Sequence, residues 1–216
     1  IERFSHKMKR NVLNKLYSVG DLFWVNAGFF LSTLRVRLSL ALQGCPPGKR
    51  FRTSGRCYIK ARPAGSLQIG DHVALYAGHR SNRVGLNNPV MLHTLGEGRI
   101  EIGDYSGGSA VVLSARSEIR IGKHVKMGGN VRVYDHDFHA LDPAVRRTPE
   151  DEAQVRTRPV FIGDDVFVGT NAMILKGSSI GERSIVGAGA VVAGLDVPPD
   201  SLVVGNPAKI LDKKSD

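Results

Sequence analysis

An aliphatic residue returns every six positions in the C-terminal part of this 216-residue chain. The series is Ile162, Val168, Ile174, Ile180, Val186 and Val192. A small residue stands one position after nearly every member and again four positions after. Neither an α-helix, with about 3.6 residues per turn, nor a strand, with a period of two, produces such a repeat. Short strands joined by tight turns and stacked coil upon coil do produce it, so the period predicts a β-helix.

The same pattern recurs upstream, in the segments that begin at Ile69, Ile102 and Ile121. We therefore expect the solenoid to occupy most of 55–205, as a prism with three faces and one coil per three hexads. Aliphatic residues point inward, small residues fill the corners, and Gly, Asn or Asp supply the positive φ of the turns. Two polar segments, 78–98 and 135–159, interrupt the pattern and are predicted to project as loops, where function is usually carried.

The N-terminal region differs in composition. Between Asp21 and Leu42, leucines recur at spacings of three and four with basic residues between them, which predicts one or two amphipathic helices. Asn26, Arg35 and Arg37 interrupt this segment before about 20 apolar residues accumulate, so it favours a buried or interfacial helix over a membrane span. "GCPPGKR" then ends the helix. The predicted organisation is a helical segment over 1–50, an all-β solenoid over 51–205 and a C-terminal tail over 206–216.

Composition limits the partners and the compartment. The net charge of +10 favours anionic partners, such as a phosphorylated cofactor, a membrane surface or nucleic acid. The two cysteines, Cys45 and Cys57, have no CxxC spacing, so neither a disulfide framework nor a zinc site is indicated. A reducing cytoplasm is the expected compartment. Aromatic residues make up only 6% while glycines number 25, which predicts an interior of small and β-branched side chains.

The run "VFIGDDVFVGTNAMILKGSSIGERSIVGAGAVVAGLDVPPDSLVVGNPAKIL" resembles the C-terminal signature of hexapeptide-repeat acyltransferases. It is most similar to their sugar O-acetyltransferase branch, with its maltose, galactoside and polysaccharide-modifying enzymes. The resemblance implies a left-handed parallel β-helix, although crossover connections are generally right-handed. It also implies a homotrimer that binds acetyl-CoA between neighbouring prisms, with each active site shared by two subunits. Neither a metal nor nucleic acid is expected.

The second interruption carries the predicted chemistry. Counting hexads from Ile121 gives Met127, Val133 and then His139, and an imidazole inside a dry prism is costly. We therefore expect the chain to leave the prism there and to present the ring at the surface. Attack of a hydroxyl on a thioester needs a general base, and histidine suits that task.

The resemblance supports His139 as the catalytic base, because the "HxLD" that begins there is similar to the family's motif. It assigns to Asp137 the carboxylate that fixes the tautomer of the ring. His136 is available as well, so which of the two histidines is the base stays open. In the alternative, His136 contacts the acceptor or is a satisfied surface residue.

The resemblance also assigns cofactor contacts. It places Thr170 and Ala188 against the pantetheine arm and Lys209 against a phosphate, within a basic groove. Phe167 occupies a place often held by tryptophan, and Gly194, after Ala193, stands where the family frequently has lysine. Other candidates for that phosphate are Lys176, Arg183 and Lys213. Candidates for acceptor contacts are Arg80, Arg83, Asn87 and Asn88, of which the last two also suit turns.

The sequence therefore predicts an acetyl-CoA-dependent O-acetyltransferase that modifies a sugar hydroxyl in polysaccharide or lipopolysaccharide biosynthesis. The basic N-terminal helix suggests attachment to the cytoplasmic face of a membrane. One alternative is an N-acetyltransferase acting on an amino sugar or an antibiotic. Another is a scaffold or a metal-binding β-helix of the gamma carbonic anhydrase type, with ligands drawn from His72, His79, His93 and His124.

Overall fold

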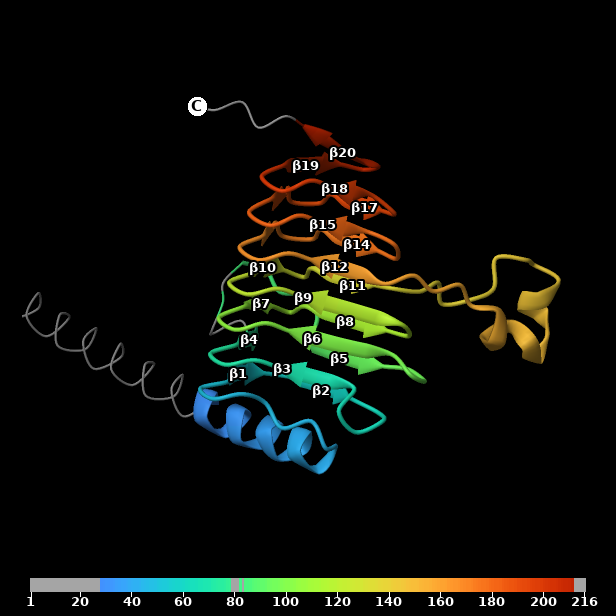
Figure 1. Cartoon of the computed structure of the whole chain (residues 1–216). Coiled ribbons are helices and arrows are strands. Elements are labelled where there is room, and N and C mark those ends of the chain that lie inside the picture. The colour runs from blue at the N-terminus through green and yellow to red at the C-terminus, as the bar shows by residue number, and fades with distance from the viewer. Residues whose placement is uncertain (1–27, 79–81, 83, 212–216) are drawn as a thin grey trace, which may run out of the picture.

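Three parallel sheets form the faces of a tapering prism in the computed structural model, which describes residues 28–78, 82 and 84–211 (Figure 1). Sheet A contains β1 (Arg52–Gly55), β4 (Ala74–Ala77), β7 (Gly107–Ser109), β10 (Lys126–Gly129), β13 (Phe167–Val168), β16 (Ile185–Val186), β19 (Leu202–Gly205) and β20 (Ala208–Leu211). Sheet B contains β2 (Cys57–Lys60), β5 (Val90–Thr94), β8 (Val112–Ala115), β11 (Arg132–Tyr134), β14 (Met173–Leu175) and β17 (Val191–Ala193). Sheet C contains β3 (Leu67–Ile69), β6 (Arg99–Ile102), β9 (Glu118–Ile121), β12 (Val160–Ile162), β15 (Ser179–Ile180) and β18 (Asp196–Val197). Each coil visits the sheets in the order A, B, C, which confirms the predicted β-helix.

The six-residue series forms the core. All six of its members are at most 2% exposed, and the upstream residues Ile102, Ile121 and Val133 continue the same inward rows. In sheet B, Val133 pairs in register with Ile174, and Ile174 pairs with Val192, so each residue stacks on its equivalent one coil away. The inward row of sheet A is aliphatic except at Thr53 and Gly108, so the repeat itself forms nearly all of the core of the prism.

The corners differ in one respect from the sequence-based expectation. Asn130, Asn171 and Asp165 adopt positive φ, as predicted for Asn and Asp, but so do His72, Tyr105, His124 and Arg183. The last four stand at the turn from sheet C to sheet A. The imidazole rings of His72 and His124 stack on the two sides of the Tyr105 ring, with centroids 4.5 and 5.0 Å away.

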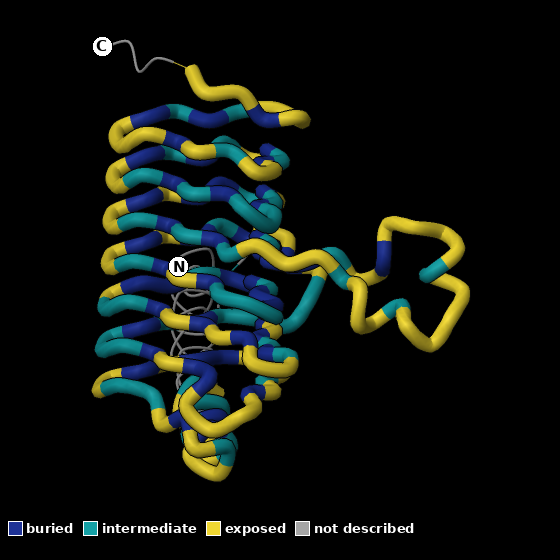
Figure 2. The backbone as a smooth tube through the Cα atoms, turned by 45° about the vertical axis from the view of Figure 1, so that its right-hand side comes forward, coloured by how far each residue is buried: buried dark blue, intermediate teal, exposed yellow. Residues whose placement is uncertain are grey.

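The described parts of the two predicted interruptions differ. Residues 90–94 of the first segment form β5, and Leu86 is buried, so these parts of the segment pack against the coils. The second segment is an arm that extends outward between β11 and β12, and most of it is exposed (Figures 1 and 2). The chain leaves the prism directly after Tyr134, where the predicted loop 135–159 begins, and His139 lies within the arm.

A helix over 28–42 covers the first coil at one end of the prism (Figure 1). Val36 and Leu40 pack into the core from this helix. Ser32 donates to Gly55 O, while Thr33 exchanges hydrogen bonds with the backbone of Thr53, so the helix is joined to β1. Within 28–211, apart from its gaps at 79–81 and 83, no helix is long and apolar enough to cross a membrane. The part of the predicted helical region before residue 28 lies outside the described residues.

The other end of the prism is closed by a hairpin. β20 runs antiparallel to β19, with Val203 opposite Ile210 and Val204 opposite Lys209. Residues 208–211, predicted to belong to a C-terminal tail, therefore extend sheet A by one strand.

Candidate active site

The arm, defined as residues 135–159, is held at its root by pairing between its outgoing and returning legs. Asp137 N donates to Arg156 O at 3.0 Å, and Arg158 N donates to Asp135 O at 2.8 Å. Two short 3₁₀ helices, η1 (Val145–Arg147) and η2 (Pro149–Gln154), fold the distal part of the arm back on itself. The arm is therefore an ordered projection with its own internal contacts.

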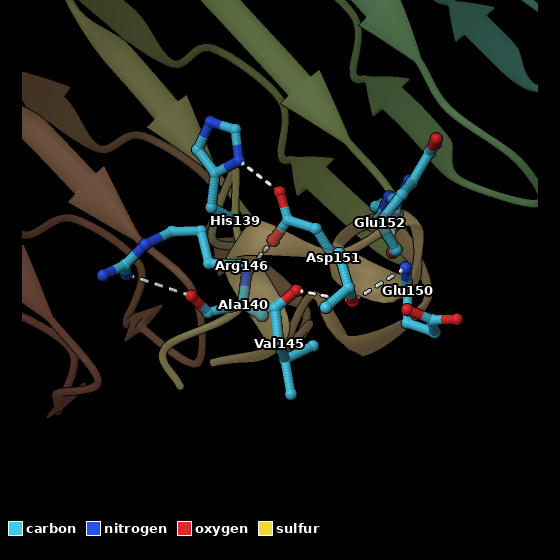
Figure 3. Close-up of polar contacts among 9 residues, drawn as sticks. His139, Ala140, Val145, Arg146, Glu150, Asp151 and Glu152 are labelled. Atoms are coloured by element: carbon cyan, nitrogen blue, oxygen red, sulfur yellow. Dashed lines mark hydrogen bonds and ion pairs between the residues drawn. The ribbon is translucent and has the colours of Figure 1, made fainter. Parts of the chain in front are cut away.

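His139 and Asp151 form the central polar pair of the arm (Figure 3). His139 Nδ1 lies 2.7 Å from Asp151 Oδ2, and Asp151 Oδ1 accepts the backbone N–H of Ala140 at 2.6 Å. Arg146 donates to Ala140 O at 3.1 Å, which fixes the same turn from the other side. The His139 side chain is 66% exposed, as the sequence predicted, so a ring held by a carboxylate faces the exterior.

The contacts of Asp151 indicate the protonation pattern of this pair. The hydrogen bond from His139, followed by that from the Ala140 backbone, holds the pKa of the Asp151 carboxyl below its usual value. An ionised carboxylate only accepts hydrogen bonds, so Nδ1 of a neutral His139 ring carries the proton. Nε2 is then the unprotonated nitrogen, which is the form that a general base requires.

His136 has a different environment. Its side chain is 2% exposed, and Nδ1 lies 2.8 Å from Oδ1 of the fully buried Asp135. The carboxylate of Asp135 also accepts the backbone N–H groups of Arg116 and Ser117, at 2.8 and 2.7 Å. Nε2 of His136 is buried without a partner among the described residues, and the Phe138 ring packs 4.7 Å from the imidazole. His136 is thus a buried residue at the root of the arm, and the prediction that it lies at the surface was wrong.

Asp137 does not contact His139. Its Oδ1 forms an ion pair with Lys176 Nζ at 2.5 Å, and Lys176 follows β14 in the next coil. The prediction that Asp137 orients the catalytic ring was therefore wrong, because Asp151 occupies that place. Arg158 approaches the turn that follows Lys176, because a Cβ on Gly177 would lie 2.8 Å from its guanidinium carbon.

A pocket of about 290 Å³ lies beside these groups. It is lined by His136, Asp137, Phe138 and His139 from the outgoing leg, by Asp151, Glu152 and Val155, and by Leu95 and Arg116 of the prism. Arg116 joins the two parts, since its guanidinium donates to the backbone oxygen of Glu152 and pairs with its carboxylate at 2.6 Å. The predicted catalytic residues therefore share one pocket, together with three charged residues that the sequence reasoning missed: Arg116, Asp151 and Glu152.

The residues predicted to bind acetyl-CoA separate into three places. Thr170 and Ala188 meet at the corner between sheets A and B, where Gly189 N donates to Thr170 O at 2.9 Å. Phe167, 50% exposed, and Lys209 belong to sheet A. Ala193 ends β17, and the following Gly194, with φ of +64°, turns toward sheet C. Thr170 and Ala188 therefore lie together at one edge of sheet B, and Ala193 and Gly194 lie at the opposite edge.

The candidate acceptor residues fall on the segment after β4. Asn87 N donates to Asn130 Oδ1, and Asn88 donates to the backbone oxygens of Pro89 and Ala110, so both stabilise local structure. Leu86 and Val84 approach Gly129, where a Cβ would meet them at 3.2 and 3.0 Å. The segment thus covers the same corner that carries Thr170. Arg80 and Arg83 lie outside the described residues, as do His79 and Lys213.

The metal-site alternative finds little support in the histidines. His72 and His124 stack on Tyr105 rather than converging on a common point, and His93 stands on sheet B. Burial, followed by the charges of Lys60 and His136, lowers the pKa of His93. Throughout the described part of the chain, no three His, Cys, Asp or Glu side chains are grouped so that they could hold a metal ion.

Comparison with known proteins places this chain in a family. Residues 159–194 match the profile described as bacterial transferase hexapeptide (six repeats). The crystal structure of the hexapeptide-repeat containing acetyltransferase VCA0836 from Vibrio cholerae is 30% identical, with a TM-score of 0.54 over 84% of this chain and 80% of that one. Its complex with acetyl coenzyme A matches at 28% identity with a TM-score of 0.50 over 86% and 79%.

Two curated sequences are also similar. A Schizosaccharomyces pombe protein described as an acetyltransferase is 40% identical over 44% of this chain, a region that spans 43% of the relative's length. The Escherichia coli (strain K12) protein WbbJ, described as a lipopolysaccharide biosynthesis O-acetyl transferase, is 29% identical over 73% of this chain and 76% of its own. Together with the three-sheet solenoid, these matches confirm the predicted left-handed β-helix, and the chain belongs to the hexapeptide-repeat acetyltransferase family.

Proposed function

We propose that this protein is an acetyl-CoA-dependent O-acetyltransferase that modifies a sugar hydroxyl, with His139 as the general base. The observation that carries the proposal is the His139–Asp151 pair, in which a carboxylate holds Nδ1 while the ring stays 66% exposed. His136 lines the same pocket, but its Nε2 is buried within the single chain and has no partner among the described residues. A general base must come within hydrogen-bond distance of the proton it removes, so the accessible ring is the better base.

The reaction follows from this arrangement. Nε2 of His139 takes the proton of the acceptor hydroxyl while its oxygen bonds to the carbonyl carbon of the acetyl thioester. The carbon–sulfur bond breaks, and the imidazolium returns the proton to the leaving thiolate, which gives an acetyl ester and free coenzyme A. Asp151 stabilises the imidazolium that forms in between, as carboxylates do in other histidine–acid pairs. Neither cysteine lines the pocket, so transfer is direct, without an acyl-enzyme.

A homotrimer would explain why one outer face of the prism is mainly apolar. The outward residues of sheet B are mainly apolar, as in Tyr58, Met91, Val112, Met173 and Val191, with Arg132 as the exception in that row. The equivalent row of sheet C is mainly polar: Gln68, Glu101, Arg120, Phe161, Ser179 and Asp196. Contiguous apolar surface on a soluble chain marks a place of association, so sheet B is the proposed contact between subunits.

The separation of the predicted contacts also supports a shared site. Thr170 and Ala188, proposed to bind the pantetheine arm, stand at the corner of sheets A and B. The arm leaves the prism at the other edge of sheet B and points away from it (Figure 2). Within one chain His139 therefore does not approach these residues, whereas the arm of a neighbouring subunit would do so. Phe138 and Leu141, exposed on the arm at 56% and 54%, would be covered in that assembly.

The acceptor is proposed from the chemistry of the pocket and from the relatives. WbbJ carries the description of an O-acetyl transferase of lipopolysaccharide biosynthesis, which supports a glycan precursor as acceptor. Arg116, Asp151 and Glu152 line the pocket and supply both donors and acceptors for a polyhydroxyl substrate.

Release of free coenzyme A from acetyl-CoA, measured against matched panels of sugar and amino-sugar acceptors, tests the proposal. We expect turnover with acceptors that offer only hydroxyl groups and an acetyl ester as product, identified by its lability to mild base. Turnover restricted to amino acceptors, with a base-stable amide as product, would replace the proposal with an N-acetyltransferase. Binding of acetyl-CoA without turnover of any acceptor would support the proposed cofactor site and would exclude the tested sugars as acceptors.

A further inference from the structure

The positive charge of the protein is concentrated at one end of the prism. Residues 28–70 contain eight Lys and Arg residues and no Asp or Glu. Residues 71–216, which include the proposed cofactor and acceptor contacts, contain 17 basic and 18 acidic residues. Within residues 28–216 the excess of positive charge therefore comes from residues 28–70.

The eight basic residues surround the end of the prism that the helix covers. We call this end the base, and define it as the helix over 28–42 together with residues 49–62 of the first coil (Figure 1). Seven of its basic side chains are exposed: Arg35, Lys49, Arg50, Arg52, Arg56, Lys60 and Arg62. Arg37 is half-buried, donates to Gly48 O at 2.7 Å and lies over the Phe51 ring. Among the described residues none of the eight forms an ion pair, so an unneutralised positive field surrounds the base.

The helix presents an apolar stripe at the same end. Leu31, Leu34, Leu38 and Leu42 are 64%, 46%, 58% and 89% exposed, and Phe30 beside them is 69% exposed. Their spacing of three and four residues places the four leucines on one face, opposite the buried Val36 and Leu40. The helix is thus apolar on two faces: one packs on the first coil and the other faces the exterior.

We propose that the base is a docking surface for an anionic lipid bilayer, with the four leucines inserted among the acyl chains. A helix with exposed leucines and flanking basic residues lies in the plane of such an interface, and Lys and Arg are attracted by anionic headgroups. The charge disfavours the simplest alternative, a second copy packed base to base, because two bases with eight unpaired positive residues each repel one another. Nucleic acid would engage the basic rim but would leave the leucines in water.

Flotation of the full chain with phosphatidylcholine vesicles, prepared with and without phosphatidylglycerol, tests the proposal. We expect binding to the phosphatidylglycerol vesicles that weakens as salt is added, and about tenfold weaker binding by the variant Leu34→Gln/Leu38→Gln. The matched control is Ile210→Gln/Leu211→Gln, which removes two exposed apolar side chains (40% and 44%) at the opposite end of the prism and is expected to bind as wild type does. Arg52→Gln/Arg56→Gln is expected to show a weaker preference for phosphatidylglycerol, because five exposed basic side chains remain at the base.

Each contrary outcome overturns the proposal. It is wrong if the wild type does not float with phosphatidylglycerol vesicles, or if the leucine variant floats equally well. A leucine variant whose oligomer is smaller than that of the wild type without lipid would assign the stripe to a second copy. Equal retention of wild type and leucine variant on a polyanion column, without vesicle binding, would assign the rim to nucleic acid. Coenzyme A release and thermal unfolding, expected to be unchanged in all variants, separate these outcomes from misfolding and from failure of the proposed function.

Discussion

The carboxylate of Asp151 holds both the ring and the backbone of the turn that follows His139. Its Oδ2 lies 2.7 Å from Nδ1 of His139, and its Oδ1 accepts the N–H of Ala140. One side chain on η2 thereby fixes the orientation of an exposed imidazole that is 12 residues away in the chain. This pair determines the first three predictions.

His139→Ala is expected to lower kcat by at least about a hundredfold, because it removes the proposed general base. Binding of acetyl-CoA, measured by calorimetry, is expected to stay unchanged, since the residues proposed to hold it lie on the prism. His136→Ala is the matched comparison from the same segment, and its effect on kcat is expected to be much smaller. The reverse ranking of the two variants, both confirmed as folded, would make His136 the base.

Asp151→Asn is expected to lower kcat by about tenfold or more while KM changes little. The carboxylate accepts hydrogen bonds from both His139 Nδ1 and Ala140 N. The amide presents a donor to one of these groups, which favours the tautomer of His139 without a proton on Nδ1. Asp142→Asn is the control, because Asp142 lies on the same arm and accepts a backbone hydrogen bond from Ala144 without contacting either histidine. If the two variants have equal kcat, Asp151 is not the orienting group.

The pH dependence of Asp151 follows from the same contacts. The hydrogen bond from His139 lowers the pKa of the carboxyl, so its folded-state titration falls below the unfolded value of about 3.9. Its contribution to stability is therefore fully present above that unfolded pKa and is lost as the pH falls through the folded one. Carbon NMR of the carboxyl should show this low midpoint, and His139→Ala should raise it. A midpoint that does not move in the variant would mean that the pair is absent in solution.

The ion pair between Lys176 and Asp137 is predicted to hold the arm to the next coil. Its side chains are only 28% and 21% exposed, so Lys176→Met leaves the Asp137 carboxylate poorly solvated. We expect faster cleavage of the arm by trypsin and a lower kcat. Lys123→Met is the control, because Lys123 pairs with Asp104 at 3.8 Å while 62% exposed, and exposed pairs contribute little. Equal cleavage rates in both variants would contradict the role of Lys176.

The apolar face of sheet B is predicted to hold the trimer together. Met173→Glu introduces a charge into its outward row, so it is expected to shift the mass measured by light scattering from trimer to monomer and to abolish turnover. Ser179→Glu makes the same addition on the outward row of sheet C and is expected to leave the trimer intact. A trimer that survives Met173→Glu but not Ser179→Glu would move the interface to sheet C.

The repeat made most of the fold predictable. Each coil repeats the same local choice of an inward aliphatic residue, a small residue and a turn, and Ile162, Ile174 and Val186 are buried as their spacing requires. The place of the arm was predictable too, because the loss of the period marks where the chain leaves the prism. The early helix was predictable from its leucines, although not which of its two apolar faces would pack.

The sequence by itself thus determined a β-helix with an inserted arm and placed His136, Asp137 and His139 on that arm. Only the tertiary structure decided their roles: Asp135 and Phe138 bury His136, Lys176 takes Asp137, and Asp151 reaches His139. The physical reason is that the prism repeats contacts between equivalent positions, which a period reveals. The arm has no period, and its partners meet through the 3₁₀ turns and through the pairing of its two legs, which no spacing in the chain encodes.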